Sequence, residues 1–130
     1  SFPTRRSSDL KATLNAAAQK YGRENIVAVF QPHRYTRLQK LWEEFKFSFA
    51  DAERVIITDV YAASEDAIDG ISGKNFANDL PDSEYIGGSI NDVARTLLPT
   101  LSKGNIVIGL GAGTITNLGK YLENYVFCFE

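Results

Sequence analysis

The chain has 130 residues, of which 44% are hydrophobic and 23% are charged, and its formal net charge is -2 at pH 7. This size and balance fit one globular domain with a moderate core, and they argue against general nucleic-acid binding, which needs a basic surface. Its apolar runs are shorter than the ~20 residues that cross a bilayer, so no membrane association is expected.

The first ten residues and the sulfur-containing residues bear on the origin of the chain. A single cysteine, Cys128, has no partner for an internal disulfide and indicates a reducing, cytoplasmic location. The absence of methionine predicts a fragment. Residues 1–10 resemble a translated sequencing-library adapter and are expected to be non-native, with 11–130 as the domain; the alternative is a polar arm with a helix cap at Ser8 or Asp9.

Helix and strand patterns alternate in the first half of the chain. The alanine-rich segment 11–22 predicts a helix that ends at Gly22. Residues 25–31 predict a buried strand that Pro32 terminates, because proline cannot donate to a sheet ladder. Apolar residues then recur at spacings of three and four from Leu38 to Phe49, which predicts a second helix whose aromatic face is core.

The second half continues the alternation and ends in a glycine turn. The predicted elements are a strand at 54–61, a surface loop at 62–73, a short helix at 73–80, a short strand at 85–86, a helix capped by Ser89 and threatened by Pro99, a strand at 105–110, a glycine turn at 111–114, a helix carrying Ile115, Leu118 and Leu122, and an edge strand at 126–130. This order predicts an α/β fold: an open, mainly parallel, Rossmann-like sheet with helices on both faces.

Polar residues follow three of the predicted strands. The segments 33–37, 59–65 and 111–114 should meet at the carboxyl edge of the sheet, where open α/β sheets bind ligands. His33, Arg34 and Arg37 come directly after a strand, and guanidinium groups suit bidentate contacts to a carboxylate. They predict a carboxylate-binding site, with an exposed basic turn as the alternative.

Two further segments could line this site. Asp59, Tyr61 and Glu65 follow the second long strand and predict a second wall. Gly111, Ala112 and Gly113 form either a ligand-facing loop or a packing turn, because they lack the third glycine of a dinucleotide fingerprint and the lysine of a phosphate loop. No metal site is expected, and no residue is assigned a catalytic role.

Three motifs resemble the C-terminal domain of the Mur ligase family. They are Phe30-Gln31-Pro32-His33-Arg34-Tyr35-Thr36-Arg37, Asp59-Val60-Tyr61-Ala62-Ala63 and Gly111-Ala112-Gly113. The resemblance extends over 11–124, and the first motif is most similar to that of the alanine-adding member. Residues 11–14 also resemble the sequence after the family's Asp-Tyr-Gly-His-His-Pro motif, which is absent here, and Ser64 stands where the family usually has glycine.

The resemblance implies an ATP-dependent ligase of cytoplasmic peptidoglycan synthesis that joins L-alanine to UDP-N-acetylmuramate through an acyl phosphate. It implies that His33, Arg34 and Arg37 hold the alanine carboxylate, and that Asp59, Tyr61 and Glu65 face the closed active site. ATP and magnesium would bind mainly to the N-terminal and central domains, which are absent from this chain, so the fragment is expected to be inactive alone.

Three other functions are compatible with the same residues. The chain could be a free-standing α/β module that binds an amino acid or another anion, or a domain of a related Mur peptide ligase. A flavodoxin-like nucleotide binder rests on the fold only, since fold does not specify function.

Overall fold

The computed structural model describes residues 7–122 and 124–129. Five parallel strands form one sheet in the order β3-β2-β1-β4-β5. The predicted α/β fold is therefore confirmed. The strands are β1 (Ile26–Phe30), β2 (Arg54–Ile57), β3 (Ser83–Tyr85), β4 (Ile106–Gly111) and β5 (Tyr125–Phe129).

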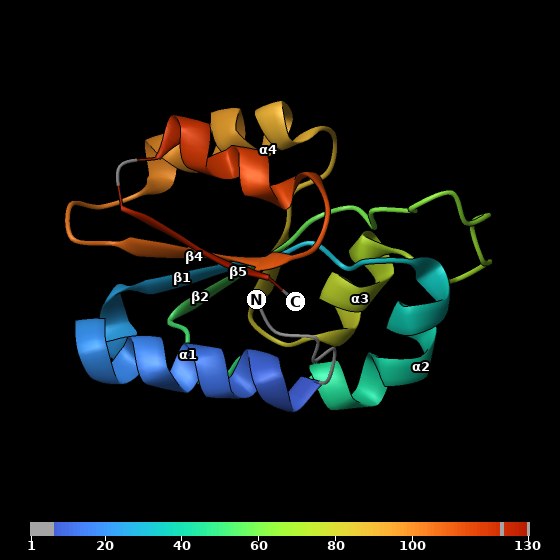
Figure 1. Cartoon of the computed structure of the whole chain (residues 1–130), viewed down its shortest axis with the longest axis horizontal. Helices are drawn as coiled ribbons and strands as arrows, with labels where there is room; N and C mark the ends of the chain where they lie inside the picture. Colours follow the sequence, from blue (N-terminus) through green and yellow to red (C-terminus); the bar gives the residue numbers. More distant parts are fainter. Residues whose placement is uncertain (1–6, 123, 130) are drawn as a thin grey trace.

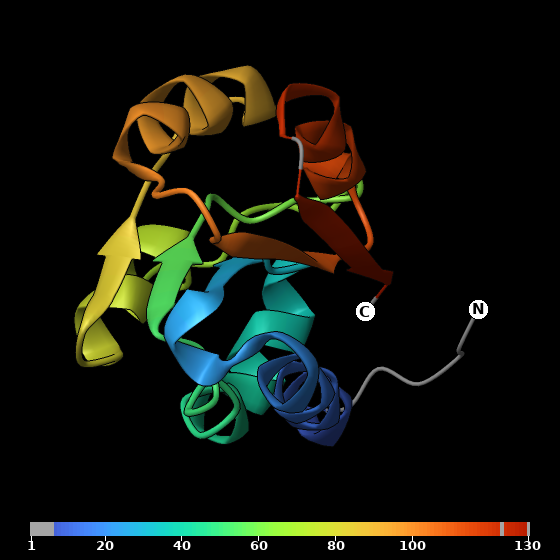
Figure 2. The ribbon, with the colours of Figure 1, turned by 90° about the vertical axis from the view of Figure 1, so that its left-hand side faces the viewer.

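Helices cover both faces of this sheet, as Figures 1 and 2 show from two directions. One layer holds α1, α2 and α3, and the other holds α4 and the C-terminal 3-10 helix η3. Both layers are needed because every residue of the central strand β1 is buried. The helical elements are α1 (Ser7–Tyr21), η1 (Arg23–Asn25), α2 (Tyr35–Phe45), α3 (Gly73–Asp79), α4 (Ile90–Leu97), η2 (Leu98–Thr100) and η3 (Thr114–Tyr121).

Phe30 organises the core on the α1-α2-α3 side. Its ring centroid lies 5.1 Å from that of Phe45, 5.3 Å from that of Phe49 and 6.2 Å from that of Phe76. Tilted and edge-to-face aromatic pairs at these distances add to the gain from burial. The aromatic core predicted for the second helix is thus confirmed at Phe45, but α2 ends there, so Phe49 is buried from the segment that follows and not from the helix.

The other face of the sheet packs against α4. Ser89 accepts from the Asp92 amide, while the Asp92 carboxylate accepts from the Ser89 amide, which is a complete capping box. At the far end, Pro99 lies in the 3-10 turn η2, so the α-helix ends at Leu97. The sequence predicted the start of this helix at Ser89; its apolar pattern ran on to Leu101, and the α-helix ends four residues earlier, close to the proline.

The segment after the glycine turn is a 3-10 helix, not the predicted regular helix. Tyr125 from the edge strand accounts for the difference. Its hydroxyl donates to the Ile115 carbonyl at 2.9 Å, and a β-carbon on Gly119 would lie only 2.8 Å from its ring. The Ile115 carbonyl, which an α-helix would pair with the Gly119 amide, therefore has a partner from outside the helix.

Two predicted boundaries also move. Helix α1 begins at Ser7, and Leu10 is buried beside Leu14 because the two are one turn apart on the same face. The adapter origin of residues 1–10 stays a prediction, and 1–6 lie outside the described residues. Strand β2 ends at Ile57, four residues early, and only an isolated bridge between Tyr61 and His33 follows. The side chain of Cys128 is not among those described.

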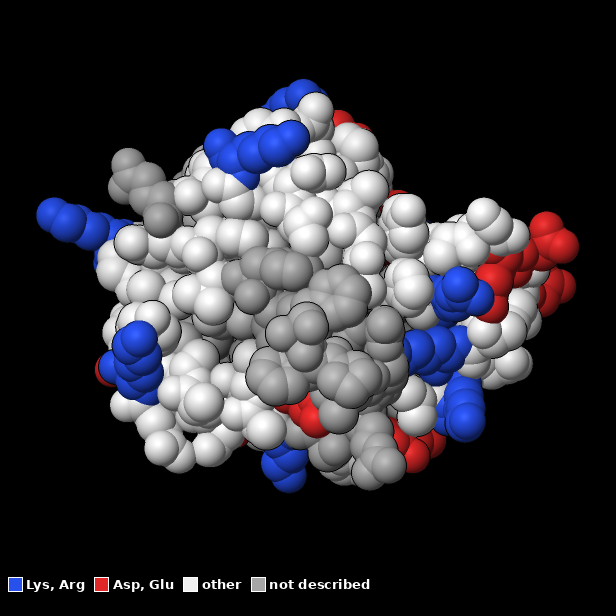
Figure 3. Space-filling view, in the orientation of Figure 1, with Lys and Arg blue, Asp and Glu red and all other residues white. Residues whose placement is uncertain are grey.

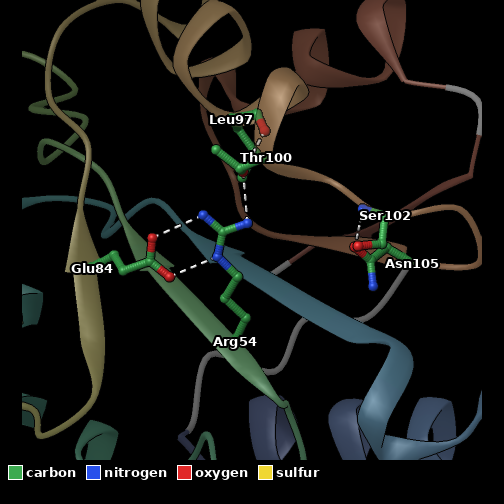
Figure 4. A network of polar contacts seen from close by, with 6 residues as sticks. All are labelled: Arg54, Glu84, Leu97, Thr100, Ser102 and Asn105. Atoms are coloured by element: carbon green, nitrogen blue, oxygen red, sulfur yellow. Dashed lines mark hydrogen bonds and ion pairs between the residues drawn. The ribbon is translucent and has the colours of Figure 1, made fainter.

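Ion pairs between elements gather at the amino edge of the sheet. Arg54 at the start of β2 makes two hydrogen bonds, of 2.6 and 2.8 Å, to the Glu84 carboxylate of β3. Its third contact, 2.7 Å, goes to the Thr100 hydroxyl, which in turn donates to the Leu97 carbonyl (Figure 4). Nearby, Arg23 pairs with Glu53 at 2.7 Å. These contacts tie β2, β3 and η2 together.

Candidate functional site at the carboxyl edge

The ends of β1 and β2 are joined by backbone hydrogen bonds beyond the regular ladder. The Tyr61 amide donates to the Pro32 carbonyl at 2.8 Å, and the Arg34 amide donates to the Tyr61 carbonyl at 2.9 Å. The His33 and Tyr61 rings are stacked, with centroids 5.8 Å apart and planes 11° apart. The structure thus brings together two of the three predicted site segments.

The glycine turn after β4 supplies the third segment. A β-carbon on Gly113 would lie 2.5 Å from Cγ of Tyr61, so the Tyr61 ring packs directly on this backbone. Gly111 has φ 153°, and a β-carbon there would lie 2.9 Å from the Gln31 carbonyl oxygen. Both glycines therefore permit close packing, and the half-buried Ala112 lies between them.

Arg34 has an unusual backbone conformation at the centre of this edge. It is the N-cap of α2, with φ 72° and ψ 140°, a region that costs a residue other than glycine ~1–3 kcal/mol. The Arg34 side chain is exposed and has no hydrogen bond or ion pair within residues 7–122 and 124–129. The turn therefore presents a cation outward.

Arg37 lies in a different environment. Its guanidinium carbon is 5.8 Å from the ring centroid of Phe45, and its Nε and Nη2 atoms are buried. This is the geometry of a cation-π contact along the helix. Arg34 is thus exposed and Arg37 is half-buried, so the two guanidinium groups are not equally available to a ligand.

Glu65 caps the helix that Arg34 begins. Its carboxylate accepts from the Thr36 amide at 3.1 Å and from the Thr36 hydroxyl. These hydrogen bonds, together with the positive charge of Arg34, hold the pKa of Glu65 below its ordinary value. The chain's own carboxylate therefore occupies the anion-binding position at this helix N-terminus. Acidic and basic side chains lie close together at this end of the molecule (Figure 3).

Asp59 contacts the connection between β3 and α4. Its carboxylate accepts from the Gly88 amide at 2.9 Å and from the Tyr85 hydroxyl. The hydrogen bond to Asp59 raises the pKa of Tyr85 to about 12. Of the predicted second wall, Tyr61 and Glu65 thus contact the segment 30–37. Asp59 instead forms its hydrogen bonds with the connection between β3 and α4.

Gln31 is a residue that the sequence reasoning did not assign. It is 5% exposed, and its side chain reaches the segment after the glycine turn. The signal was present, since Gln31 is a polar residue at the end of an apolar strand and directly precedes Pro32.

Comparison with curated proteins shows which proteins the chain resembles. The chain is 36% identical over 122 residues to UDP-N-acetylmuramate--L-alanine ligase of Rickettsia africae, covering 88% of the chain and 25% of the relative. It is 38% identical to the ligase of that name from a Sulfurihydrogenibium species, covering 92% and 27%. The chain resembles UDP-N-acetylmuramate--L-alanine ligase. The resemblance that the motifs predicted is confirmed.

The match covers most of this chain but only a small part of each UDP-N-acetylmuramate--L-alanine ligase. The chain spans about a quarter of the length of these curated relatives, and the Rickettsia felis ligase shows the same proportions, with 34% identity over 88% of the chain and 26% of the relative. No family model matches the chain.

The described residues contain no evident metal site. Within 7–122 and 124–129, no three His, Cys, Asp or Glu side chains gather where they could hold a metal ion. In the same part of the chain, no helix is long and apolar enough to cross a bilayer. A groove of about 520 Å³ lies at the amino edge between Arg23, Phe47 and Pro81, away from the ligase motifs.

Proposed function

We propose that this chain is part of an ATP-dependent ligase that joins L-alanine to UDP-N-acetylmuramate in cytoplasmic peptidoglycan synthesis, and that it forms the domain that receives the alanine. The names of the curated relatives support this assignment. The meeting of the three Mur-like motifs at one edge of the sheet supports it independently, because that edge is where open α/β sheets bind ligands.

The exposed guanidinium of Arg34 is the observation that carries the proposal. A cation held outward by a strained backbone, with no ion pair among the described residues, is suited to a carboxylate from outside the chain. In the proposal Arg34 binds the alanine carboxylate directly. His33, stacked on Tyr61, lies beside it and orients the alanine, and Arg37 contributes positive charge from the first turn of α2.

The chain's contribution to the reaction is positioning. Holding the alanine by its carboxylate sets the direction of its amine, and orientation of this kind lowers a barrier by removing the entropy of encounter. ATP and magnesium are implied for the full-length ligase. The described residues hold no cluster of side chains that could bind a metal ion, and no step through either group is assigned to this chain. We therefore expect the 130-residue chain to release no phosphate from ATP when magnesium, alanine and UDP-N-acetylmuramate are supplied.

An Arg34→Ala variant of the full-length protein, recovered from the source DNA, tests the proposal. Loss of a charge-assisted contact to the carboxylate should raise the KM for alanine about ten- to hundredfold and leave the KM for ATP unchanged. Arg95→Ala is the matched control, because Arg95 is an exposed arginine on the remote helix α4. An unchanged KM for alanine would remove Arg34 from the site.

The source DNA also separates the ligase from the alternative of a free-standing anion-binding module. The ligase requires a phosphate loop encoded upstream of Lys11, whereas the module requires none. A start codon just upstream of Lys11, with no further domain, would overturn the catalytic assignment.

A further inference from the structure

The end of β1 is joined to the start of η3 by the side chain of Gln31. The backbone amide of Gln31 donates to the Leu110 carbonyl at 2.9 Å. Beyond that bond, Gln31 Nε2 donates to the Thr114 hydroxyl at 2.8 Å, and Gln31 Oε1 accepts from the Ile115 amide at 3.0 Å. The side chain therefore spans the glycine turn and holds the first residues of η3.

The orientation of this amide is determined by its partners. The Ile115 backbone N–H can only donate, so the atom that faces it must be the amide oxygen, and the nitrogen then faces Thr114. Ile115 is fully buried, and its amide is among the backbone donors that begin η3. Without Gln31 this donor would lack its partner, which makes the contact costly to lose.

The turn that Gln31 spans also supports the proposed alanine site. Gly113 packs on the Tyr61 ring, and Tyr61 stacks on His33, two residues after Gln31. One buried amide thus sits between the backbone that carries Arg34 and the turn that supports Tyr61. A shift of the turn would be transmitted to both His33 and Arg34, since the Tyr61 backbone is bonded to that of Arg34.

We infer that Gln31 is a positioning residue of the alanine subsite: its side chain locks the glycine turn against Tyr61 and thereby fixes the position of His33 and Arg34. This inference rests on the proposed function. Gln31 touches no substrate in this account, and it acts through the turn and the ring.

The test is carried out in the full-length ligase with the variants Gln31→Met, Thr114→Val and Thr114→Ser. Methionine keeps the length of the side chain but removes both hydrogen bonds, and valine removes only the hydroxyl that Gln31 contacts. We expect Gln31→Met to raise the KM for alanine about tenfold and Thr114→Val to raise it about threefold, with the KM for ATP constant. Thr114→Ser keeps the hydroxyl and should recover most of the loss seen with valine.

Thr100→Val is the matched control, because the Thr100 hydroxyl takes part in the Arg54 network at the opposite edge. It should leave the KM for alanine unchanged. A second readout is hydrogen exchange at the Ile115 amide in the 130-residue chain, which should become at least tenfold faster in Gln31→Met. If Gln31→Met fails to fold, the comparison of Thr114→Val with Thr114→Ser decides, because Thr114 is exposed.

The outcomes separate the two claims. Alanine-dependent turnover by the wild type, with an unchanged KM for alanine in Thr114→Val and in a folded Gln31→Met, would overturn the inference and leave the proposed function intact. Absence of alanine-dependent turnover in the wild type would overturn both.

Discussion

Arg54 at the amino edge of the sheet and Arg34 at the carboxyl edge are both arginines beside a strand end, but their charges are handled in opposite ways. Arg54 is clamped by Glu84 and Thr100, whereas Arg34 is exposed on a strained backbone. The positive-φ residues Ala63 and Ser64 also lie at the carboxyl side, in the loop after β2. Backbone strain is not confined to the carboxyl side, since Asp82 before β3 also has a positive φ. The difference between the two arginines therefore lies in the partners of their side chains: Arg54 is paired within the domain, whereas Arg34 is exposed.

The largest effect should come from forcing the carboxyl edge apart. In Gly73→Ala, the new β-carbon would lie 1.9 Å from the Thr58 carbonyl oxygen, a backbone atom that cannot rotate away. We expect a loss of about 3 kcal/mol in the free energy of unfolding, measured by urea denaturation. Gly70→Ala is the control, since nothing lies within 4 Å there and only its φ of +80° opposes the change, at about 1 kcal/mol. Equal losses in the two variants would contradict the steric account.

The next effect concerns the amino edge. Arg54→Met removes the ion pair with Glu84 and the contact with Thr100, and we expect a loss of about 1–2 kcal/mol, limited because the Glu84 side chain is 44% exposed. In the full-length ligase the KM for alanine should not change. A selective rise in the KM for alanine would show that the amino edge also affects alanine binding, and would contradict the contrast between the two edges.

A smaller, pH-dependent loss of stability should follow from removing the Glu65 cap of α2. The pKa of Glu65 is lowered from its ordinary 4.5, chiefly by the hydrogen bond from the Thr36 side chain. Its stabilising contribution is therefore complete above the unfolded-state pKa and is lost as the pH falls through the lower folded-state pKa. Glu65→Gln should lower Tm at pH 7, and the difference from wild type should shrink below pH 4.5. A Tm difference that stays constant on acidification would exclude this cap; Asp66→Asn, in the same loop, is the control.

The smallest effect should come from the loop between these groups. Ser64 has φ 73°, a conformation in which glycine is unstrained, but glycine also gains freedom in the unfolded chain. The two effects oppose each other, so Ser64→Gly should change the free energy of unfolding by less than about 1 kcal/mol. Ser64→Val makes the opposite change at the same position. It should lower the free energy of unfolding clearly, because a β-branched residue tolerates positive φ poorly.

The sequence predicted the three central strands well because they are largely buried. A strand such as β1, apolar at every position, has few alternatives, and the Ser89 capping box and Pro99 mark their helix by local chemistry. The 3-10 geometry of η3 was not predictable, because it depends on Tyr125, which arrives from a later strand.

The meeting of the three strand-end segments was predicted, but their individual contacts were not, for a related reason. The strand ends were correctly expected to meet, since parallel strands share their direction. That Glu65 caps α2 and that Arg37 lies against Phe45 follows from contacts 29 and 8 residues apart, which spacing alone does not reveal. Gln31 was overlooked because its partners lie more than 80 residues away.

The central place of β1 has a consequence for the synthesis of the protein. Ile26 pairs with Ile106, so a strand made early waits for 80 further residues before one of its two neighbours exists. At ~5–20 residues per second this interval is roughly 4–16 s on the ribosome. Throughout it, one edge of the Ile26–Phe30 segment lacks its neighbouring strand and can pair with other chains, which is a hazard of misassembly.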